Sequence, residues 1–464
     1  MVGGGPVGLS AAVALGRAGI PCTVFEREVE VDDHPRARGV RTRTMEVFAR
    51  WGLEDAVRRE ALPRRANQFI YCDSVAGAEV ARSVEDLREE LSPTSVCRVG
   101  QDVVRRVLAA EVADLREGVE ITGVEDLGDH VVVRTSGGDV VADYVIAADG
   151  VGSGVRRGLG VEFDGELLGY GQSVYWRGDI GEWARGRLCI QFLTGDRAGE
   201  SASVASVDGR ERWVTMVTRM GVSARPEPPT EAEAREIVRR AVGADFEPEV
   251  VRIATWRISA QVARTWRVGR VFLVGDAAHS FPPTGGFGMN SGVQDVHNLA
   301  WKLAHVLRGR ASPALLDTYE AERKAVAVSN AEWSVRNGVR MGEIRRAIVA
   351  DDREGLDVVI REQSEHIDAV DQDLGFGYAP AHGADPLREA VVGHRFPHTP
   401  VRVGDVLVSA VLLPEEFTVL TADLVLDPKV LGGADAVVVR PDGIVAWAGD
   451  RRDADRAVAE VLRG

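Results

Sequence analysis

Residues 275–290 hold the densest set of chemically useful groups in the chain, with one acid, one histidine, two prolines and four glycines. The apolar run 271–274 predicts a strand that ends there, and apolar spacing after Gly292 predicts a helix. The Asp276 carboxylate could then accept from a polyol hydroxyl, while glycines let the backbone approach a ring. First-turn N–H groups can face phosphate or a developing anion. This layout indicates a large anionic cofactor more than an ordinary strand-turn-helix junction.

A second motif lies at the start of the chain. The residues Gly3-Gly4-Gly5-Pro6-Val7-Gly8 fit G-x-G-x-x-G, and a helix is expected over 9–16. A strand expected at 22–25 ends in Glu26, 18 residues after Gly8, near where an acid reaches a ribose 2′-OH. Only Met1 and Val2 precede the glycines, so we expect the first strand to be a stub that could weaken cofactor binding.

A third motif lies between these two. The apolar run 143–148 ends in Asp149-Gly150 and is followed by a turn and by Arg156 and Arg157, a pattern that plain structure could also give. The ordered set GGGPVG, ADGVGSGVRR and VGDAAHSFPPTGGFGMN resembles the group A flavoprotein monooxygenases, the FAD-dependent aromatic hydroxylases. The resemblance covers residues 1 to about 380. Within that family it is nearest to the branch that tailors aromatic polyketides and phenols.

The resemblance implies an α/β fold with a discontinuous Rossmann-like FAD-binding domain of the p-hydroxybenzoate hydroxylase type. That domain is expected at 1–65, 94–162 and 261–380, and a β-sheet substrate domain at 66–93 and 163–260. Residues 390–464 resemble a small, shortened thioredoxin-like domain, and because they contain no cysteine a redox role is excluded there. We expect strands at 172–178, 187–193, 201–207 and 212–217, and helices at 42–51, 101–108, 230–242, 313–341 and 454–462.

Composition agrees with a globular enzyme and excludes other classes. The 464 residues are 45% hydrophobic and 27% charged, with a net charge of −15. Nucleic acid and anionic membrane surfaces are therefore poor partners. No stretch of 18 apolar residues and no signal peptide is found, so no membrane association is expected. The four cysteines are scattered and no metal-ligand spacing occurs, which favours a cytoplasmic location and no metal.

The resemblance implies a set of FAD contacts, most of them on the three motifs. These are Gly3, Gly5, Pro6, Val7, Gly8, Glu26, Arg27, Arg36, Arg38, Gln101, Asp149, Arg156, Asp276, Pro283, Gly285, Gly288, Met289 and Asn290. Simpler interpretations stay open: a solvated basic face for Arg36 and Arg38, a helix cap for Gln101, and an ion pair between Asp149 and Arg156.

Candidates for the substrate cavity are Tyr175, Trp176, Trp256 and Phe287, with Pro283 and Met289 beside them. Ordinary core packing is at least as good an interpretation for the two tryptophans. His279 could relay a proton, but a structural hydrogen bond to its loop is favoured. We assign no catalytic base, because a phenolate substrate or water can serve.

The family reaction would use NADPH or NADH to reduce FAD and O2 to form a flavin C4a-hydroperoxide that oxygenates an aromatic small molecule. The chain has one dinucleotide motif, so the nicotinamide is expected to dock transiently near Asp149 and Arg156. A Baeyer–Villiger oxygenase of a polycyclic ketone and a non-oxygenating FAD oxidoreductase remain alternatives. The sequence separates neither hydroxylation from Baeyer–Villiger chemistry nor a monomer from a homodimer. It points to a tailoring enzyme of antibiotic-type biosynthesis.

Overall fold

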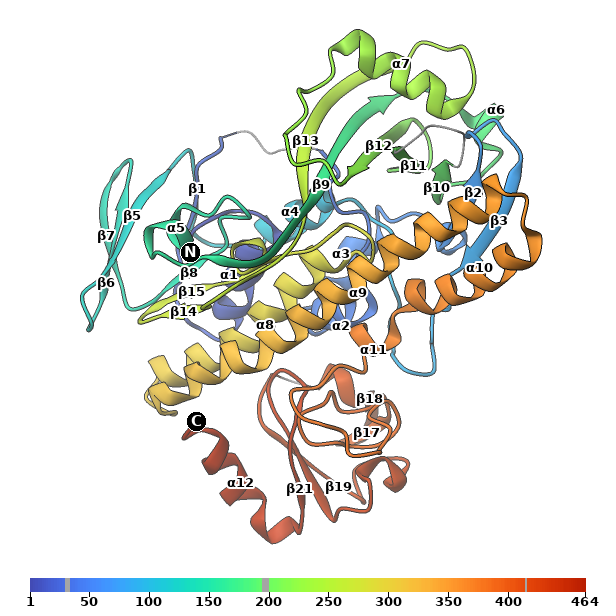
Figure 1. Cartoon of the computed structure of the whole chain (residues 1–464). Coiled ribbons are helices and arrows are strands. Elements are labelled where there is room, and N and C mark those ends of the chain that lie inside the picture. Colours follow the sequence, from blue (N-terminus) through green and yellow to red (C-terminus); the bar gives the residue numbers. More distant parts are fainter. Residues whose placement is uncertain (30–33, 194–199, 414) are drawn as a thin grey trace.

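The computed structural model describes the whole chain except residues 30–33, 194–199 and 414 (Figure 1). Helices and strands alternate along it, so the expected α/β class is confirmed. The three motifs lie around a small sheet, a large sheet forms the upper part of the view, and the C-terminal part lies below the long helices α8 and α9.

The small sheet is mostly parallel and begins with the N-terminal residues. Its strands, in spatial order, are β4 (Leu115–Glu117), β1 (Val24–Glu26), the single residue Val2, β8 (Val145–Ala147), β15 (Val271–Leu273) and β14 (Arg267–Val268). Val2 donates to the Ile146 carbonyl at 3.0 Å and accepts from Ala148 N at 2.8 Å. The expected stub therefore holds the central position. Because the motif strands are parallel, all three motifs begin at one edge of the sheet.

Helices pack around this sheet and carry its apolar core. Helix α1 (Pro6–Arg17) packs against α4 (Gln101–Ala109) and against α8 (Phe287–Leu307). Helix α8 is buried from Asn290 to Ala304, and it carries Asp295, His297 and Lys302 inside. Buried charges must be paired, so we expect each of these three side chains to have a polar partner on a neighbouring element.

The large sheet has eight strands and is antiparallel except where β10 meets β2. Its strands, in spatial order, are β16 (His279–Ser280), β13 (Glu249–Ala263), β9 (Phe163–Arg177), β12 (Arg212–Met220), β11 (Glu200–Ser206), β10 (Ile190–Leu193), β2 (Gln68–Cys72) and β3 (Glu79–Val84). Helix α7 (Glu231–Val242) covers one face, which we call the outer face. A capping box of Thr230 and Glu233 starts that helix.

Shorter elements connect these parts. They are α2 (Thr42–Arg50), α3 (Glu54–Arg58), α5 (Gly154–Gly158), α6 (Gly181–Ala184) and a three-stranded sheet of β5 (Ile121–Asp126), β6 (Val131–Thr135) and β7 (Gly138–Ala142). After α8 follow α9 (Thr318–Val349), α10 (Arg353–Asp368) and α11 (Val370–Asp373). Helix α10 packs against α9 and against β3 at the edge of the large sheet.

The C-terminal part contains a hairpin and a separate three-stranded antiparallel sheet. The hairpin is β17 (Pro400–Val403) with β18 (Val406–Ser409), and the sheet is β19 (Thr418–Thr421), β20 (Ala436–Val439) and β21 (Val445–Gly449). Helix α12 (Ala454–Val461) packs on β20 and β21. The turn expected at Pro441-Asp442-Gly443 does join β20 to β21.

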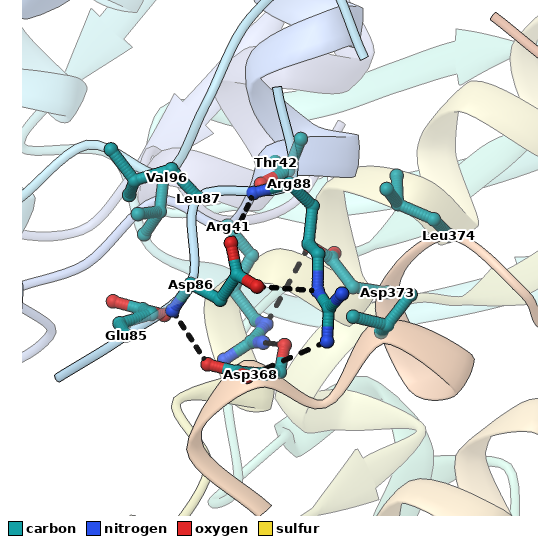
Figure 2. A pocket seen from close by; sticks show the side chains of 11 residues that line it. Arg41, Thr42, Glu85, Asp86, Leu87, Arg88, Val96, Asp368, Asp373 and Leu374 are labelled. Carbon is teal, nitrogen blue, oxygen red and sulfur yellow. Dashed lines mark hydrogen bonds and ion pairs between the residues drawn. The ribbon is translucent and has the colours of Figure 1, made fainter. Parts of the chain in front are cut away.

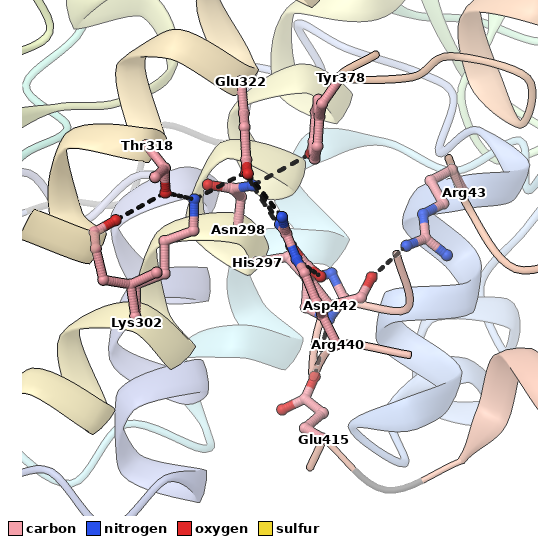
Figure 3. A network of polar contacts seen from close by, with 11 residues as sticks. Arg43, His297, Asn298, Lys302, Thr318, Glu322, Tyr378, Glu415, Arg440 and Asp442 are labelled. Atoms are coloured by element: carbon pink, nitrogen blue, oxygen red, sulfur yellow. Dashed lines mark hydrogen bonds and ion pairs between the residues drawn. The ribbon is translucent and has the colours of Figure 1, made fainter. Parts of the chain in front are cut away.

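A buried ionic network joins the C-terminal part to the rest of the chain (Figure 3). Arg440 donates to both Glu322 carboxylate oxygens at 2.6 and 3.0 Å, and Lys302 of α8 donates to Glu322 at 2.8 Å. Arg43 of α2 donates to the Asp442 carbonyl at 2.6 Å. The C-terminal part is therefore fixed directly to the helices that border the three motifs.

Most expected helices and strands are present, with two notable differences in length. Strand β9 spans Phe163–Arg177 where a strand was expected only at 172–178, and its partner β13 was not expected as a single element. Their mutual pairing over most of their length stabilises both beyond what local patterns indicate. Within the part of the chain that the structure covers, no helix is long and apolar enough to span a membrane.

Candidate functional site

The glycines of the N-terminal motif, residues 3–8, have two distinct roles in the turn before α1. A Cβ on Gly3 would lie 2.4 Å from the Ala148 carbonyl oxygen, and one on Gly8 would lie 2.0 Å from the Gly3 oxygen. Gly5 instead faces space with no heavy atom within 4 Å, and it caps α1 without a side chain. Pro6 takes the first helical position, where no N–H is needed. Gly3 and Gly8 allow close packing, and Gly5 leaves room beside free N–H groups.

The acid of this motif lies directly against the glycine turn. Glu26 accepts from Gly4 N at 2.7 Å, so the carboxylate is held at the end of β1. Arg27 points elsewhere, because its side chain is 70% exposed and contacts Glu28. Arg105 of α4 donates to the Gly4 carbonyl at 3.0 Å, a contact that sequence reasoning missed. Arg105 lies four residues after Gln101, so the two share one face of α4, and this spacing is the sequence signal that could have predicted the contact.

Val7 brings the N-terminal glycine motif and the 275–290 motif together. Cβ atoms on Gly275 and Gly292 would lie 3.1 and 2.5 Å from its methyl groups, so only glycines fit there. Asp276 follows at the end of β15, and a Cβ on Gly288 would lie 3.8 Å from its carboxylate. The surrounding protein raises the pKa of the Asp276 carboxyl, and the charges of His279 and Arg36 oppose that rise.

The start of α8 presents backbone N–H groups next to Asp276. Its N-cap residue is Gly286, which has φ +68° and, as a glycine, has no side chain that could accept from these N–H groups. Asn290 donates its side-chain amide to the carbonyls of Gly286 at 2.7 Å and Gly39 at 3.1 Å. It also accepts from Arg41 N at 2.9 Å. Gly288 and Met289, both half-buried, lie in this first turn, where N–H groups lack helical partners.

The segment 36–41 connects the cofactor motifs to the large sheet. Arg36 is exposed and acts electrostatically on Asp276. Arg38 points the other way, with Nη2 3.8 Å from the Met216 sulfur on β12. Gln101, at the start of α4, donates its backbone N–H to the Ala37 carbonyl at 2.8 Å. The sequence predicted FAD contacts for both Arg36 and Arg38, but in the structure the two side chains lie toward different regions of the molecule.

The Asp149-Gly150 motif contains two buried polar atoms without hydrogen-bond partners. Asp149 accepts from Val155 N at 3.1 Å through one oxygen, while its other oxygen is buried and unpaired. The Arg156 guanidinium lies 3.7 Å from the Phe163 ring centroid, and its Nε is also buried and unpaired. Within the described chain no ion pair joins Asp149 to Arg156, so each group keeps an unsatisfied polar atom.

His279 belongs to a buried network behind the Asp276 loop. Its Nε2 lies 2.7 Å from Asp295, which also accepts from Arg323 at 2.9 Å and from Gly275 N at 3.2 Å. The His279 ring is fully buried and stacks on Phe281 with centroids 4.6 Å apart. The ring therefore bonds to an acid of α8, where a hydrogen bond to the loop backbone was expected. Asp295 was missed, although an acid inside an apolar helix predicts a buried partner.

The loop before α8 is held by packing and by one arginine. Gly285 has φ +143°, and a Cβ there would lie 2.7 Å from the Phe287 ring. Phe287 is 3% exposed, with the Arg41 guanidinium 5.2 Å from its centroid, so it packs inside the protein. Pro283 is exposed. Phe287 therefore fixes the loop, and Pro283 lies at its surface.

The Arg41 side chain also lines a small polar pocket (Figure 2). It donates to the Asp368 carbonyl at 2.6 Å, and the Asp368 carboxylate accepts from Asp86 N at 2.8 Å. Arg88 pairs with Asp86 at 3.2 Å. These contacts join the connection 85–88 and the end of α10 to the segment that runs beside α8.

Adjacent residues of β9 face opposite sides of the large sheet. Tyr175 faces the inner side, where its hydroxyl accepts from Arg212 at 2.7 Å. Trp176 faces α7, donates to Thr215 at 2.9 Å and stacks on Trp213 with centroids 6.1 Å apart. The structure therefore places Trp176 in the outer core, away from Tyr175.

Trp256 lies on the same face as Tyr175. It pairs with Gly171, which is four residues before Tyr175 on β9, and a Cβ on Gly171 would lie 2.2 Å from the indole. Side chains alternate along a strand, so Gly171 and Tyr175 share the inner face. Trp256 is half-buried, and it remains a candidate for the substrate cavity.

Comparisons with known proteins agree with this geometry. Residues 1–334 match the FAD binding domain family. The chain is 33% identical to tetracenomycin A2 monooxygenase-dioxygenase of Streptomyces glaucescens, over 98% of this chain and 94% of the relative. A provisionally assigned polyketide hydroxylase of Streptomyces halstedii is 38% identical over 70% of this chain, which spans only 62% of that relative. A structure of aklavinone-11 hydroxylase with FAD and aklavinone has TM-score 0.82 and 28% identity, covering 99% of this chain and 97% of that chain.

The chain therefore belongs to the FAD binding domain family and, within it, to the group A aromatic monooxygenases. It is an FAD-dependent monooxygenase.

Proposed function

We propose that the enzyme hydroxylates a phenolic or polycyclic polyketide-type aromatic molecule, with FAD as cofactor and NADPH or NADH as hydride donor. The observation that carries the proposal is the segment 36–41, which joins the cofactor motif at 275–290 and Gln101 of α4 to one face of the large sheet. Relatives named for tetracenomycin and aklavinone support this substrate class. No feature of the structure favours a Baeyer–Villiger or non-oxygenating alternative.

The residues at the sheet edge fit FAD. Gly5 leaves open space before free N–H groups of α1, which suits a pyrophosphate. Glu26 lies where it can hold the adenosine ribose, and Asp276 where it can accept from the ribityl chain. The first-turn N–H groups of α8 near Met289 and Asn290 can stabilise a developing anion on the ring. Arg36, beside Asp276, adds positive charge for the same end of the cofactor.

When bound, FAD supplies hydride acceptance and oxygen activation, and the chain binds, orients and shields the reactants. Tyr175 and Trp256 on the inner face form part of the proposed substrate surface, with Pro283 on the loop before α8. Phe287 is left out, because it packs inside the protein. Trp176 is left out of this surface, because it packs under α7. His279 is held by Asp295, so no side-chain base is proposed, and a phenolate substrate or water serves in its place.

The reduced nicotinamide is proposed to dock transiently near Asp149 and Arg156, whose unpaired buried atoms can meet its polar groups. We propose that residues 1–65, 94–162 and 261–380 form the FAD domain, residues 66–93 and 163–260 the substrate domain, and residues 390–464 the C-terminal domain. The four cysteines form no disulfide in the described part of the chain, which suits a reducing cytoplasm, and the enzyme is expected to act as a monomer or homodimer.

The test is NADPH and NADH oxidation by the purified holoenzyme with a panel of phenols, naphthols and anthraquinones, with product mass recorded. We expect an aromatic product heavier by one oxygen and faster flavin reduction when the aromatic molecule is present. Nicotinamide oxidation without any oxygenated product across the panel would contradict the proposal. A ring-expanded ester from a ketone would instead establish the Baeyer–Villiger reaction.

A further inference from the structure

Arg38 borders a hollow on the inner face of the large sheet that none of the cofactor motifs lines. The hollow is shallow and open to solvent, and its walls include Phe69 of β2, Ile190 of β10, Ala205 of β11 and Arg98. Binding sites for whole drug-sized molecules usually range from about 300 to 1,000 Å³, and the enclosed space here is far smaller. The hollow therefore suits a small polar group such as a carboxylate, and the rings that carry this group would lie outside it.

The two arginines at the hollow differ in their partners. Arg98 forms an ion pair with Glu85 and donates to the Asn67 side chain at 3.2 Å. Arg38 pairs with no carboxylate in the described part of the chain, and its Nη1 is buried without a hydrogen-bond partner. Among the described residues, its polar contact is that of Nη2 with the Met216 sulfur at 3.8 Å. One positive charge therefore remains uncompensated at this wall.

Arg38 keeps its charge at neutral pH despite this environment. Burial, with a smaller contribution from Arg98, lowers the pKa of Arg38 only to about 10. An unpaired guanidinium atom removed from water is costly, and a charged acceptor offsets that cost. A planar guanidinium also matches a carboxylate in a bidentate geometry.

Aromatic rings continue from the hollow along the same face. Phe69 stacks on Phe192 with centroids 5.9 Å apart, and Phe192 stacks on Tyr71 at 5.4 Å. The strand register places them on one side, since Phe69 pairs with Ile190 and Tyr71 pairs with Phe192. Tyr71 is buried behind them, whereas Phe69 and Phe192 are half-buried, so a flat ring system can lie along these two side chains while an acid group on its edge reaches Arg38.

The lining of the hollow argues against a cofactor phosphate as the anion. Gly5, Glu26 and Asp276, which define the cofactor side, are absent from its walls. Arg36, two residues before Arg38, serves that side by acting on Asp276. The segment 36–38 therefore places Arg36 on the cofactor side and Arg38 at the hollow.

We propose that Arg38 is a specificity-determining residue that binds a carboxylate on the aromatic substrate, so that the preferred substrates are aryl carboxylic acids. The inference rests on the proposed function, because it names the substrate class of that same site.

The test compares 3-hydroxy-2-naphthoate with its methyl ester, which has the same rings but no charge. Their dissociation constants for the FAD-loaded enzyme are measured from the change in flavin absorbance, in the wild type and in Arg38→Gln and Arg38→Lys. Arg64→Gln is the matched control, because Arg64 is 70% exposed and pairs with Glu89. We expect Arg38→Gln to weaken the acid ten- to hundredfold and the ester less than twofold. Arg38→Lys should keep part of the acid preference, and Arg64→Gln all of it.

Equal weakening of acid and ester, or equal affinity of both for the wild type, would overturn the proposal. So would a selective increase in the FAD dissociation constant or in the NADPH KM, which would assign Arg38 to a phosphate. Product mass distinguishes a failure of the acid site from a failure of the proposed hydroxylase function. Arg38-dependent acid binding without any oxygenated product keeps the acid site and removes the hydroxylase. Hydroxylation of 2-naphthol with no preference for the acid keeps the hydroxylase and removes the acid site.

Discussion

The cofactor side and the substrate side of the site are positioned by different physical means. On the cofactor side, Gly3, Gly8 and Gly292 bring backbones so close that a single methyl group would overlap a neighbouring atom. On the substrate side, the pleat of β9 decides the role of each residue, and it sends Tyr175 and Trp176 to opposite faces. Residue type thus specifies the first side, and strand register specifies the second.

The interactions that stabilise the two sides also differ. The cofactor side and the C-terminal part share buried ion pairs, such as Glu46 with Arg43 at 2.8 Å and with Arg395 at 3.0 Å. The outer face of the large sheet is stabilised by aromatic packing of Trp176 and Trp213 beneath α7. Acid should therefore weaken the first region more than the second, and truncation of large side chains should do the reverse.

The largest effect is expected for Gly8→Ala. The added Cβ would lie 2.0 Å from the Gly3 carbonyl oxygen, well below the 3.0 Å that real Cβ atoms keep. The turn must then move, so we expect at least a hundredfold loss of FAD affinity, measured by titration of the apoenzyme. Gly16→Ala is the matched control on the same helix, because no heavy atom lies within 4 Å of the new Cβ. It should bind FAD normally and gain about 0.5–1 kcal/mol of stability. Normal FAD binding by Gly8→Ala would refute the close-packing argument.

Trp176→Ala should destabilise the protein by about 3–5 kcal/mol, because a large buried side chain leaves a cavity under α7. Substrate binding by the folded fraction should change little. The half-buried Trp256, on the opposite face, provides the contrast. Trp256→Ala should cost less stability but raise the KM for the aromatic substrate about threefold or more, since loss of a side chain of this size removes contact area. Denaturant unfolding and steady-state kinetics measure both quantities. A larger KM effect for Trp176→Ala would reverse the assignment of the two faces.

The ionic region is tested by Glu46→Gln across pH. Burial favours the neutral acid, but Arg395 and Arg43 outweigh it and lower the pKa of Glu46 to about 2 from 4.5. A depressed carboxyl pKa adds stability above pH 4.5 that is lost as pH falls toward 2. We expect Glu46→Gln to lose about 3 kcal/mol at pH 7, and the gap to wild type to narrow by about 1.4 kcal/mol at pH 3.5.

Glu60→Gln serves as the control for Glu46→Gln. Glu60 pairs with Arg106 at the surface, where both side chains are about half exposed, so its loss should cost less than about 1 kcal/mol. Unfolding free energies from denaturant titrations at both pH values give the comparison. A gap for Glu46→Gln that stays constant between pH 7 and pH 3.5 would show that the pair contributes little through ionisation.

The sequence predicts the cofactor side well because its requirements are local. Glycines with fixed spacing, a strand before them and an acid such as Glu26 or Asp276 after a strand are visible in a single stretch. The short first strand was also predicted, and in the structure Val2 pairs with neighbours on both sides in the sheet. Arg105 and Asp295 were missed because their partners, Gly4 and Arg323, lie on other elements.

The substrate side could not be assigned in the same way. Tyr175 and Trp176 are adjacent and both aromatic, and only the pairing of β9 with β12 and β13 tells which one faces inward. Arg36 and Arg38 pose the same problem, since a two-residue spacing gives no direction without the neighbouring chain. The burial of Phe287 likewise depends on Arg41 and Gly285. Such facts arise from tertiary contacts and have no local signature.

The smallest effect concerns Asp276, whose role depends on its charge and position more than on packing. Its carboxylate lies between β15 and the first turn of α8, near Arg36 and His279. Hydrogen bonds to a charged acceptor contribute about 1.5–3 kcal/mol, so Asp276→Ala should weaken FAD ten- to hundredfold. Asp276→Asn keeps an acceptor oxygen but no charge and should lose less. Since the side chain is exposed, neither variant should change the unfolding midpoint of the apoenzyme appreciably. An unchanged FAD dissociation constant in Asp276→Ala would show that backbone groups alone hold the ribityl end.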